Sequence, residues 1–183
     1  LDRNLAYGTG LNGILKEDGC VFHHCGHYIA YGDGGLKGMT FAMYALNGSA
    51  FAVSQQAYEN VRNVLQTLRF QCHGTNVPVV FAGRHPHGKM VISAENYKYF
   101  ALCAMERGDR EAVRWYCELS GESTDEVSEK LFEWYKNHGN VKSDSICVEG
   151  NHSYPMACAC VHRRENFMAV AKGYSRYLWG SEI

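Results

Sequence analysis

The sequence predicts a mainly α-helical protein with a short antiparallel β region towards its C-terminal end. Between residues 36 and 138, apolar side chains recur at helical spacing in segments of about 12–18 residues that glycines separate. After Gly139 the pattern changes to two short apolar segments that flank a polar turn, which is typical of paired strands. These two observations determine the fold class.

Five helices are predicted, each ending at or near a glycine. In the second of them, Tyr58, Val61, Leu65 and Leu68 recur at the spacing of one helix face. Ser93 and Asp109 are the predicted N-caps of the third and fourth helices, and residues 123–126 form a capping box for the fifth. The predicted helices are residues 36–46, 54–71, 93–106, 109–121 and 123–138.

Helices of this length joined by short turns form antiparallel helical hairpins. A plain helical bundle satisfies the same pattern. The predicted strands are residues 156–161 and 166–171, with a turn at 162–165. Two or three strands cannot bury both of their faces alone. We therefore expect a domain boundary near residue 145, between a helical part (1–145) and the beginning of a β domain (146–183).

A His- and Tyr-rich segment precedes the first predicted helix and is the most distinctive part of the sequence. It starts at Asp18-Gly19 and places an imidazole at His24 and a phenol at Tyr31. Glycines at positions 32, 34 and 35 predict a shaped loop over this region. A loop that holds a base and an acid within reach of one bond suits proton transfer. A second loop adds further basic side chains: Arg84, His85, His87 and Lys89.

These loops resemble the catalytic loops of polysaccharide lyase family 8, most closely those of the chondroitin sulfate ABC lyases. In that family an Asp-Gly turn precedes a His, a Tyr follows, and Gly-Arg-His-Pro and Ser-Glu-Ile elements come later. Elements that match this pattern stand in the same order here: Asp18-Gly19, His24, Tyr31, residues 83–86 and residues 181–183.

The resemblance implies an α/α toroid over residues 1–145 and the first strands of an antiparallel β-sandwich over residues 146–183. It also implies cleavage of chondroitin or dermatan sulfate, and of hyaluronan as a further candidate, by β-elimination to unsaturated uronate products. Family members are several times longer, so we expect this chain to be a fragment whose partner is the rest of the same enzyme. The resemblance implies export to the periplasm or the cell exterior.

The composition constrains the partners. The formal net charge is −1, so no overall positive field attracts a polyanion, and any attraction has to be local. Nucleic acid is not an expected partner. A membrane is not expected either, since no run is long and apolar enough to span a bilayer. The eight cysteines include no Cys-x-x-Cys pair, and Cys103 and Cys117 are expected to be buried. Trp115 and Trp134 are also expected to pack in the core.

The resemblance assigns catalytic roles to His24, Tyr31, Arg84 and Glu182. Tyr31 is the expected acid towards the departing O4 oxygen, and Arg84 supports it because a guanidinium is always charged. Glu182 would hold Arg84 or His24 in position through a charge-assisted hydrogen bond. His24 is either a base on the opposite face of the sugar or a donor near the carboxylate. Substrate-binding roles are expected for His85, His87 and Tyr28.

The uronate carboxylate must also be neutralised. In the family either an Asn from an earlier helix or a divalent cation (Ca²⁺ or Mg²⁺) performs this role, and neither component can be located in the sequence. No residue is assigned as a metal ligand. His23 and His27 are expected to line the groove or face solvent.

Two other functions compete with this interpretation. One is a metal-binding protein that uses His23, His24, Cys25 and His27, because imidazole and thiolate suit zinc. Their spacing fits no standard zinc motif. The other is a non-catalytic glycan-binding module that keeps the groove and has lost the reaction.

Overall fold

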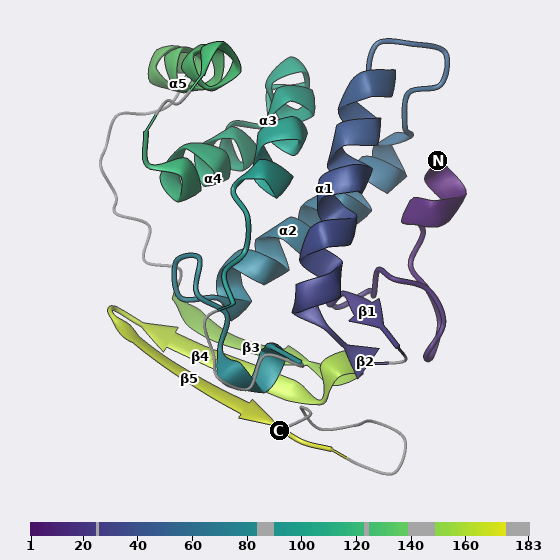
Figure 1. Ribbon diagram of the computed structural model, residues 1–183, viewed down its shortest axis with the longest axis vertical. Coiled ribbons are helices and arrows are strands. Elements are labelled where there is room, and N and C mark those ends of the chain that lie inside the picture. The colour runs from purple at the N-terminus through teal and green to yellow at the C-terminus, as the bar shows by residue number, and fades with distance from the viewer. Residues whose placement is uncertain (25, 84–89, 123–124, 139–148, 175–183) are drawn as a thin grey trace. The chain divides into compact units, whose positions relative to one another are not determined.

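The computed structural model describes residues 1–24, 26–83, 90–122, 125–138 and 149–174. The chain forms two compact units: residues 1–32, 54–92 and 145–183 make the first, and residues 33–53 and 93–144 make the second. Over the described residues the elements are mainly helices, with a three-stranded antiparallel sheet near the C-terminus (Figure 1). The predicted class is therefore confirmed. The expected boundary at residue 145 lies outside the described residues and stays a prediction.

The second unit is built from helices. Helix α1 (Ile29–Leu46) begins in the first unit and continues into the second, where it is joined by α3 (Glu95–Arg107), α4 (Arg110–Ser120) and α5 (Glu126–His138). Helices α3 and α4 pack closely against each other, and α5 contacts both. Large apolar side chains with no more than 3% of their surface exposed fill this core: Leu36, Met43, Tyr97, Phe100, Trp115, Tyr116 and Leu131.

Most of the predicted helix ends are correct. Asp109 caps α4 by accepting a hydrogen bond from the Ala112 amide at 3.2 Å, and Gly108 ends α3 in the left-handed conformation. Ser93 lies one residue before the N-cap of α3, yet its hydroxyl accepts a hydrogen bond from the Glu95 amide at 3.2 Å. For α5 the capping side chain is Asp125, which accepts a hydrogen bond from the Ser128 amide at 2.9 Å.

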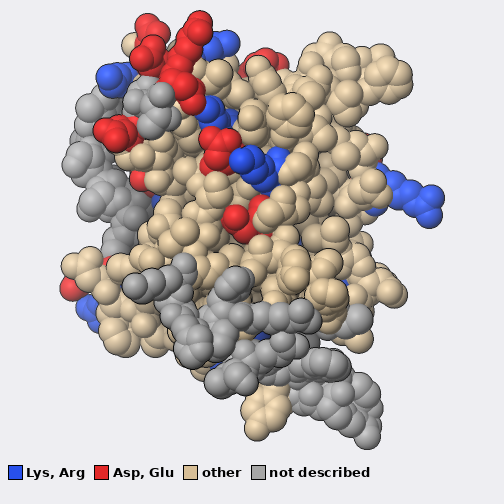
Figure 2. All heavy atoms as spheres, in the orientation of Figure 1, with Lys and Arg blue, Asp and Glu red and all other residues tan. Residues whose placement is uncertain are grey.

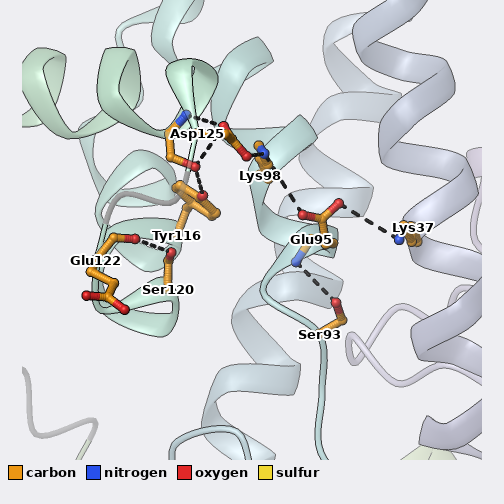
Figure 3. A network of polar contacts seen from close by, with 9 residues as sticks. Lys37, Ser93, Glu95, Lys98, Tyr116, Ser120, Glu122 and Asp125 are labelled. Carbon is orange, nitrogen blue, oxygen red and sulfur yellow. Dashed lines mark hydrogen bonds and ion pairs between the residues drawn. The ribbon is translucent and has the colours of Figure 1, made fainter.

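A polar network fixes the start of α5 against α3 and α4 (Figure 3). Asp125 accepts a hydrogen bond from the Lys98 ammonium, and this bond is the main reason that the pKa of Asp125 falls to about 2. The Ser128 hydroxyl bonds both Asp125 (3.1 Å) and the Tyr116 hydroxyl (2.7 Å). Because the pKa of Asp125 is depressed, this contribution to stability is present above pH 4 and is lost as the pH falls towards 2.

Helix α1 corrects a prediction. The glycines at 32, 34 and 35 do not form a loop but lie inside this helix. Glycine lowers helix propensity, so packing has overridden the local preference. Gly32 shows one reason, since a Cβ there would lie 2.3 Å from a methyl carbon of Val21. A glycine at this position allows the first turn of α1 to approach the segment that precedes it in the first unit.

We expect opposite effects from two alanine substitutions in α1. Gly34→Ala should stabilise the protein by about 0.5–1 kcal/mol, because alanine favours the helix and no described atom lies within 4 Å of the added Cβ. Gly32→Ala should destabilise it by about 1–3 kcal/mol through the clash with Val21. Thermal unfolding of the two variants checks this, and a stabilising Gly32→Ala would contradict the packing described for α1.

In the first unit, α2 (Gln55–Gln71) carries the core-facing residues that the sequence predicted. Tyr58, Val61, Leu65 and Leu68 are all at most 2% exposed. The last carbonyls of α2 lack partners within the helix. Arg163 binds two carbonyls at this end, since its Nη1 donates to the carbonyl of Arg69 (2.9 Å) in the last turn and to that of the C-cap residue Cys72 (2.8 Å).

The sheet of the first unit has the order β3-β4-β5, with β4 between the other two (Figure 1). Its strands are β3 (Gly150–Tyr154), β4 (Ala159–Arg164) and β5 (Phe167–Lys172), and all neighbours are antiparallel. The two predicted strands exist, but β4 begins three residues later than expected and the turn is shorter. Pro155–Ala157 forms a 3-10 helix instead, and β3, a polar segment without strand-like alternation, was missed.

None of the helices in the described part of the chain combines the length and apolar character that crossing a membrane requires.

Candidate functional site

The Asp18-Gly19 turn is a structural anchor of the first unit. One Asp18 carboxylate oxygen accepts a hydrogen bond from the Cys20 amide (3.1 Å), and the other accepts one from the Met156 amide (2.8 Å). Gly19 has φ +79°, and a Cβ there would lie 2.0 Å from the Thr67 hydroxyl oxygen. The turn therefore packs directly against α2 and ties the chain before the His-rich segment to the 3-10 helix at residues 155–157.

A two-stranded hairpin follows this turn. Strands β1 (Phe22–His23) and β2 (Gly26–His27) pair antiparallel, with His23 opposite Gly26. His24 stands at the connection with φ +50°, a backbone conformation that costs free energy for any residue except glycine. Strained residues of this kind concentrate at functional sites. The hairpin thus presents His24 at its exposed tip.

Four rings from the hairpin and the first turns of α1 form one cluster, which we call the ring cluster: His23, His24, Tyr28 and Tyr31. The His24 and Tyr31 ring centroids lie 5.5 Å apart at an interplanar angle of 85°, and Tyr31 is 47% exposed. Tyr28 is half-buried, with its ring centroid 4.9 Å from that of Tyr31. The structure therefore brings together the imidazole and the phenol that the sequence predicted to act on one bond.

His23 also belongs to the ring cluster, although the sequence analysis assigned it no catalytic role. Its ring is closer to Tyr31 than that of His24 is, with a centroid distance of 4.6 Å, and it lies 4.1 Å from the His24 ring. The sequence could have indicated that His23 is exposed, because side chains alternate along a strand. In β1, Phe22 is buried and the next side chain, His23, is exposed.

Gly83, the residue before the second loop, contacts the ring cluster. Gly83 has φ +61°, and a Cβ there would lie 2.6 Å from the Tyr28 ring. Only glycine fits both the conformation and the contact. The remaining predicted site residues, Arg84, His85, His87 and Glu182, lie outside the described residues, so their assignments stay predictions.

His27 corrects the expectation that it lines a groove or faces solvent. It is only 5% exposed, and burial lowers the pKa of its imidazole to about 4. Its Nδ1 donates to the Val21 carbonyl at 3.1 Å, and its ring packs edge-on against Phe81 at 5.1 Å between centroids. His23 and His24 are exposed, so the three imidazoles of the proposed zinc set do not share one environment.

One buried cysteine thiol lies next to the hairpin, and two others lie in the second unit. Burial raises the pKa of the Cys20 thiol well above its usual range, and this thiol accepts a hydrogen bond from the Gln71 amide at 3.4 Å. Cys103 and Cys117 are buried as predicted, with pKa values raised to about 11 and about 12 by burial. Within the described ranges, no group of three or more His, Cys, Asp or Glu side chains could hold a metal ion.

Of the three tryptophans, two were expected to pack in the core, and for Trp134 this expectation is wrong. Trp115 is 3% exposed and lies in the core, as predicted. Trp134 is half-buried and lines an open pocket of about 340 Å³ together with Glu106 and Glu133. Its ring stacks on that of His138 at 4.5 Å. In the view of Figure 2, acidic and basic side chains lie mixed over the helices of the second unit, consistent with the nearly neutral composition.

Comparison with known protein families identifies this arrangement. A family model described as "Lyase, catalytic" matches residues 1–113, which include the hairpin, the ring cluster and Gly83. The chain belongs to this lyase family. The lyase relationship that the sequence motifs predicted is thereby confirmed.

Two curated relatives of this lyase chain carry the name chondroitin sulfate ABC exolyase. The protein from Bacteroides thetaiotaomicron is 35% identical over the whole of this chain and 20% of its own length. The one from Proteus vulgaris is 30% identical over the whole of this chain and 18% of its own length. The chain therefore spans about a fifth of the length of the curated relatives it matches.

A solved structure shows the fold. The xanthan lyase of Paenibacillus superposes with a TM-score of 0.58 at 17% identity, over 88% of this chain and 17% of that one. At this identity the likeness concerns the fold alone.

Proposed function

We propose that this chain is part of the catalytic region of a polysaccharide lyase that cleaves uronate-containing glycosaminoglycans by β-elimination. Chondroitin and dermatan sulfate are the proposed substrates, with hyaluronan as a further candidate. The observation that supports this best is the exposed His24–Tyr31 pair in a chain of the lyase family. The names of the two curated relatives favour chondroitin sulfate among the uronate polymers.

The proposed reaction needs a proton removed from C5 of the uronate and another delivered to the departing O4 oxygen. Tyr31 has the exposure and the neighbours for proton delivery, because a phenol is a good acid near neutral pH. For the epimer that presents its C5 proton on the same side, Tyr31 also serves as the base. His24 acts on the opposite face of the sugar, from a hairpin tip with a strained backbone.

Arg84 and Glu182 complete the proposed set on sequence grounds. Gly83, the residue before Arg84 in the sequence, lies against Tyr28 in the ring cluster. Electrostatic stabilisation of the enolate-like transition state is expected to be the largest contribution to the rate. His85, His87 and Tyr28 are the proposed substrate-binding residues.

The proposed group that neutralises the uronate carboxylate is either an Asn or a divalent cation (Ca²⁺ or Mg²⁺). The described residues hold no cluster of three or more carboxylate, imidazole or thiolate groups that could ligate one. The described residues do not decide between the two, and either would be held elsewhere in the longer enzyme.

We also propose that the chain is part of an α/α toroid and of the β-sandwich that follows it. The enzyme is proposed to be periplasmic or secreted. The helices of the second unit and the antiparallel sheet of the first are compatible with the start of such an architecture. The rest of the same enzyme would supply its remainder.

The direct test is ultraviolet absorbance of unsaturated uronate products, measured with the intact enzyme on chondroitin sulfate, dermatan sulfate and hyaluronan separately. A rise on chondroitin or dermatan sulfate is the expected result. No rise on any of the three, with folded protein and Ca²⁺ or Mg²⁺ supplied, would contradict the proposed substrates and leave the glycan-binding module as the better interpretation.

We also expect His24→Ala to affect the two uronate epimers unequally. A base on one face of the sugar serves only the epimer whose C5 proton points towards it, so one of chondroitin or dermatan sulfate should lose about 100-fold or more in kcat/KM and the other less. Initial rates on the two polymers check this. Equal losses would remove the epimer-specific role and leave His24 as a donor near the carboxylate.

A further inference from the structure

The buried imidazole of His27 is the clearest feature of the first unit that the proposed chemistry does not use. A carbonyl oxygen can only accept, so the 3.1 Å contact to the Val21 carbonyl places the proton of the neutral ring on Nδ1. Nε2 is then an acceptor. It is buried and has no hydrogen-bond partner of acceptable geometry among the described residues. Unsatisfied buried groups are rare and require an explanation.

His27 connects the two segments that carry the candidate site. On one side it belongs to β2, pairs with Phe22 and immediately precedes Tyr28, whose amide donates to the same Val21 carbonyl at 3.0 Å. On the other side its ring packs against Phe81, two residues before Gly83. The Tyr28–Gly83 contact is a second link between the same segments.

We propose that His27, in its neutral form, is a positioning residue that holds the hairpin and its flanking residues (21–28) against residues 79–83, which begin with the 3-10 helix Val79–Phe81, and so fixes the His24–Tyr31 pair relative to Gly83. This inference rests on the proposed function for its catalytic consequence. The structural link itself does not depend on the reaction.

The surroundings of His27 make the link sensitive to acid. A proton on Nε2 would place a charge in a buried site, and the Lys172 ammonium on β5 opposes that charge. Lys172 donates to the Val80 carbonyl at 3.1 Å, which places it at the same turn. The Asp18 carboxylate and the Gln71 side chain on α2 favour protonation, but burial outweighs them.

The direction of the pH effect follows from the pKa of the His27 imidazole in the opened and in the folded state. The imidazole titrates at 6.5 when exposed and at about 4 in the folded protein. An opened state therefore binds the proton more tightly, and the link weakens as the pH falls from 6.5 towards 4. At pH 5 the equilibrium for opening should be about 20-fold more favourable than at neutral pH.

Hydrogen exchange of the intact enzyme, read in peptides covering residues 20–32 and 76–83, tests the link without relying on turnover. After correction for intrinsic rates, both segments of the wild-type protein should exchange faster together between pH 7 and pH 5. His27→Asn, which cannot titrate, should lose this pH-dependent increase. His162→Asn, on the exposed face of β4, is the matched control and should keep it.

His27→Phe keeps an aromatic ring against Phe81 but removes the donor to Val21. It should speed exchange of both segments at neutral pH and lower kcat about 10- to 100-fold, with KM within about threefold of the wild-type value. If exchange of the two segments in the wild-type protein does not rise on acidification, or only the hairpin responds, the link is wrong. A protein that eliminates no substrate but shows the coupled exchange would contradict the proposed function and leave the link intact.

Discussion

Tyr31→Phe in the intact enzyme is expected to reduce turnover of chondroitin sulfate by about 10²–10⁴-fold while the polymer still binds. The substitution removes only the hydroxyl, and the ring still fills its place beside His23 and Tyr28. The proposed mechanism assigns delivery of the proton to this hydroxyl, so its loss should leave the departing oxygen without its acid. Initial rates and a separate binding measurement with the polymer check the two halves of this prediction.

Tyr28→Phe is the matched control for this experiment. It removes the same atom from a ring in the same cluster, but Tyr28 is half-buried and packs against Gly83. Its kcat should stay within about tenfold of the wild-type value, because it is assigned to substrate binding and not to proton transfer. Wild-type rates for Tyr31→Phe, or equal losses in both variants, would contradict the assignment of the acid.

Gly19→Ala should destabilise the first unit by about 2–5 kcal/mol. Two costs add: the backbone has φ +79°, and the new Cβ would lie 2.0 Å from the Thr67 hydroxyl oxygen on α2. The turn anchors the segment that leads into the hairpin, so the ring cluster should open with it. Hydrogen exchange of peptides from α2 and residues 18–28 gives the local opening free energy.

Gly10→Ala separates the cost of backbone strain from the cost of the clash. Gly10 has φ +54°, and no described atom lies within 4 Å of the place that the alanine methyl group would take, so the cost should be only the backbone strain of about 1–2 kcal/mol. Similar losses in both variants would show that the contact with Thr67 contributes nothing.

The helices were predictable because their signals are local. Tyr58, Val61, Leu65 and Leu68 recur at helical spacing, and Asp109 and Gly108 mark helix ends through their own hydrogen bonds and backbone preferences. Helix α1 shows the limit of such signals. Its glycines predicted a loop, yet the first turn packs so closely against Val21 that the position of Gly32 has no room for a side chain.

The candidate site was predictable only in part. His24 and Tyr31 were assigned through the resemblance to the family motifs, and the structure places their rings together. The burial of His27 could not be read from a run of neighbouring histidines, because it depends on Phe81, which lies more than fifty positions further along the chain. Strand β3 was missed because its residues are polar, and its stability comes from pairing with β4.

The central claim is that the glycosidic bond is broken by elimination and not by hydrolysis. Digestion of chondroitin sulfate by the intact enzyme in H₂¹⁸O, followed by mass spectrometry of the products, tests it most directly. Elimination adds no water, so the non-reducing ends should be unsaturated and no ¹⁸O should enter during cleavage. Saturated products with one ¹⁸O for each bond broken would show a hydrolase and contradict the roles assigned to Tyr31 and His24.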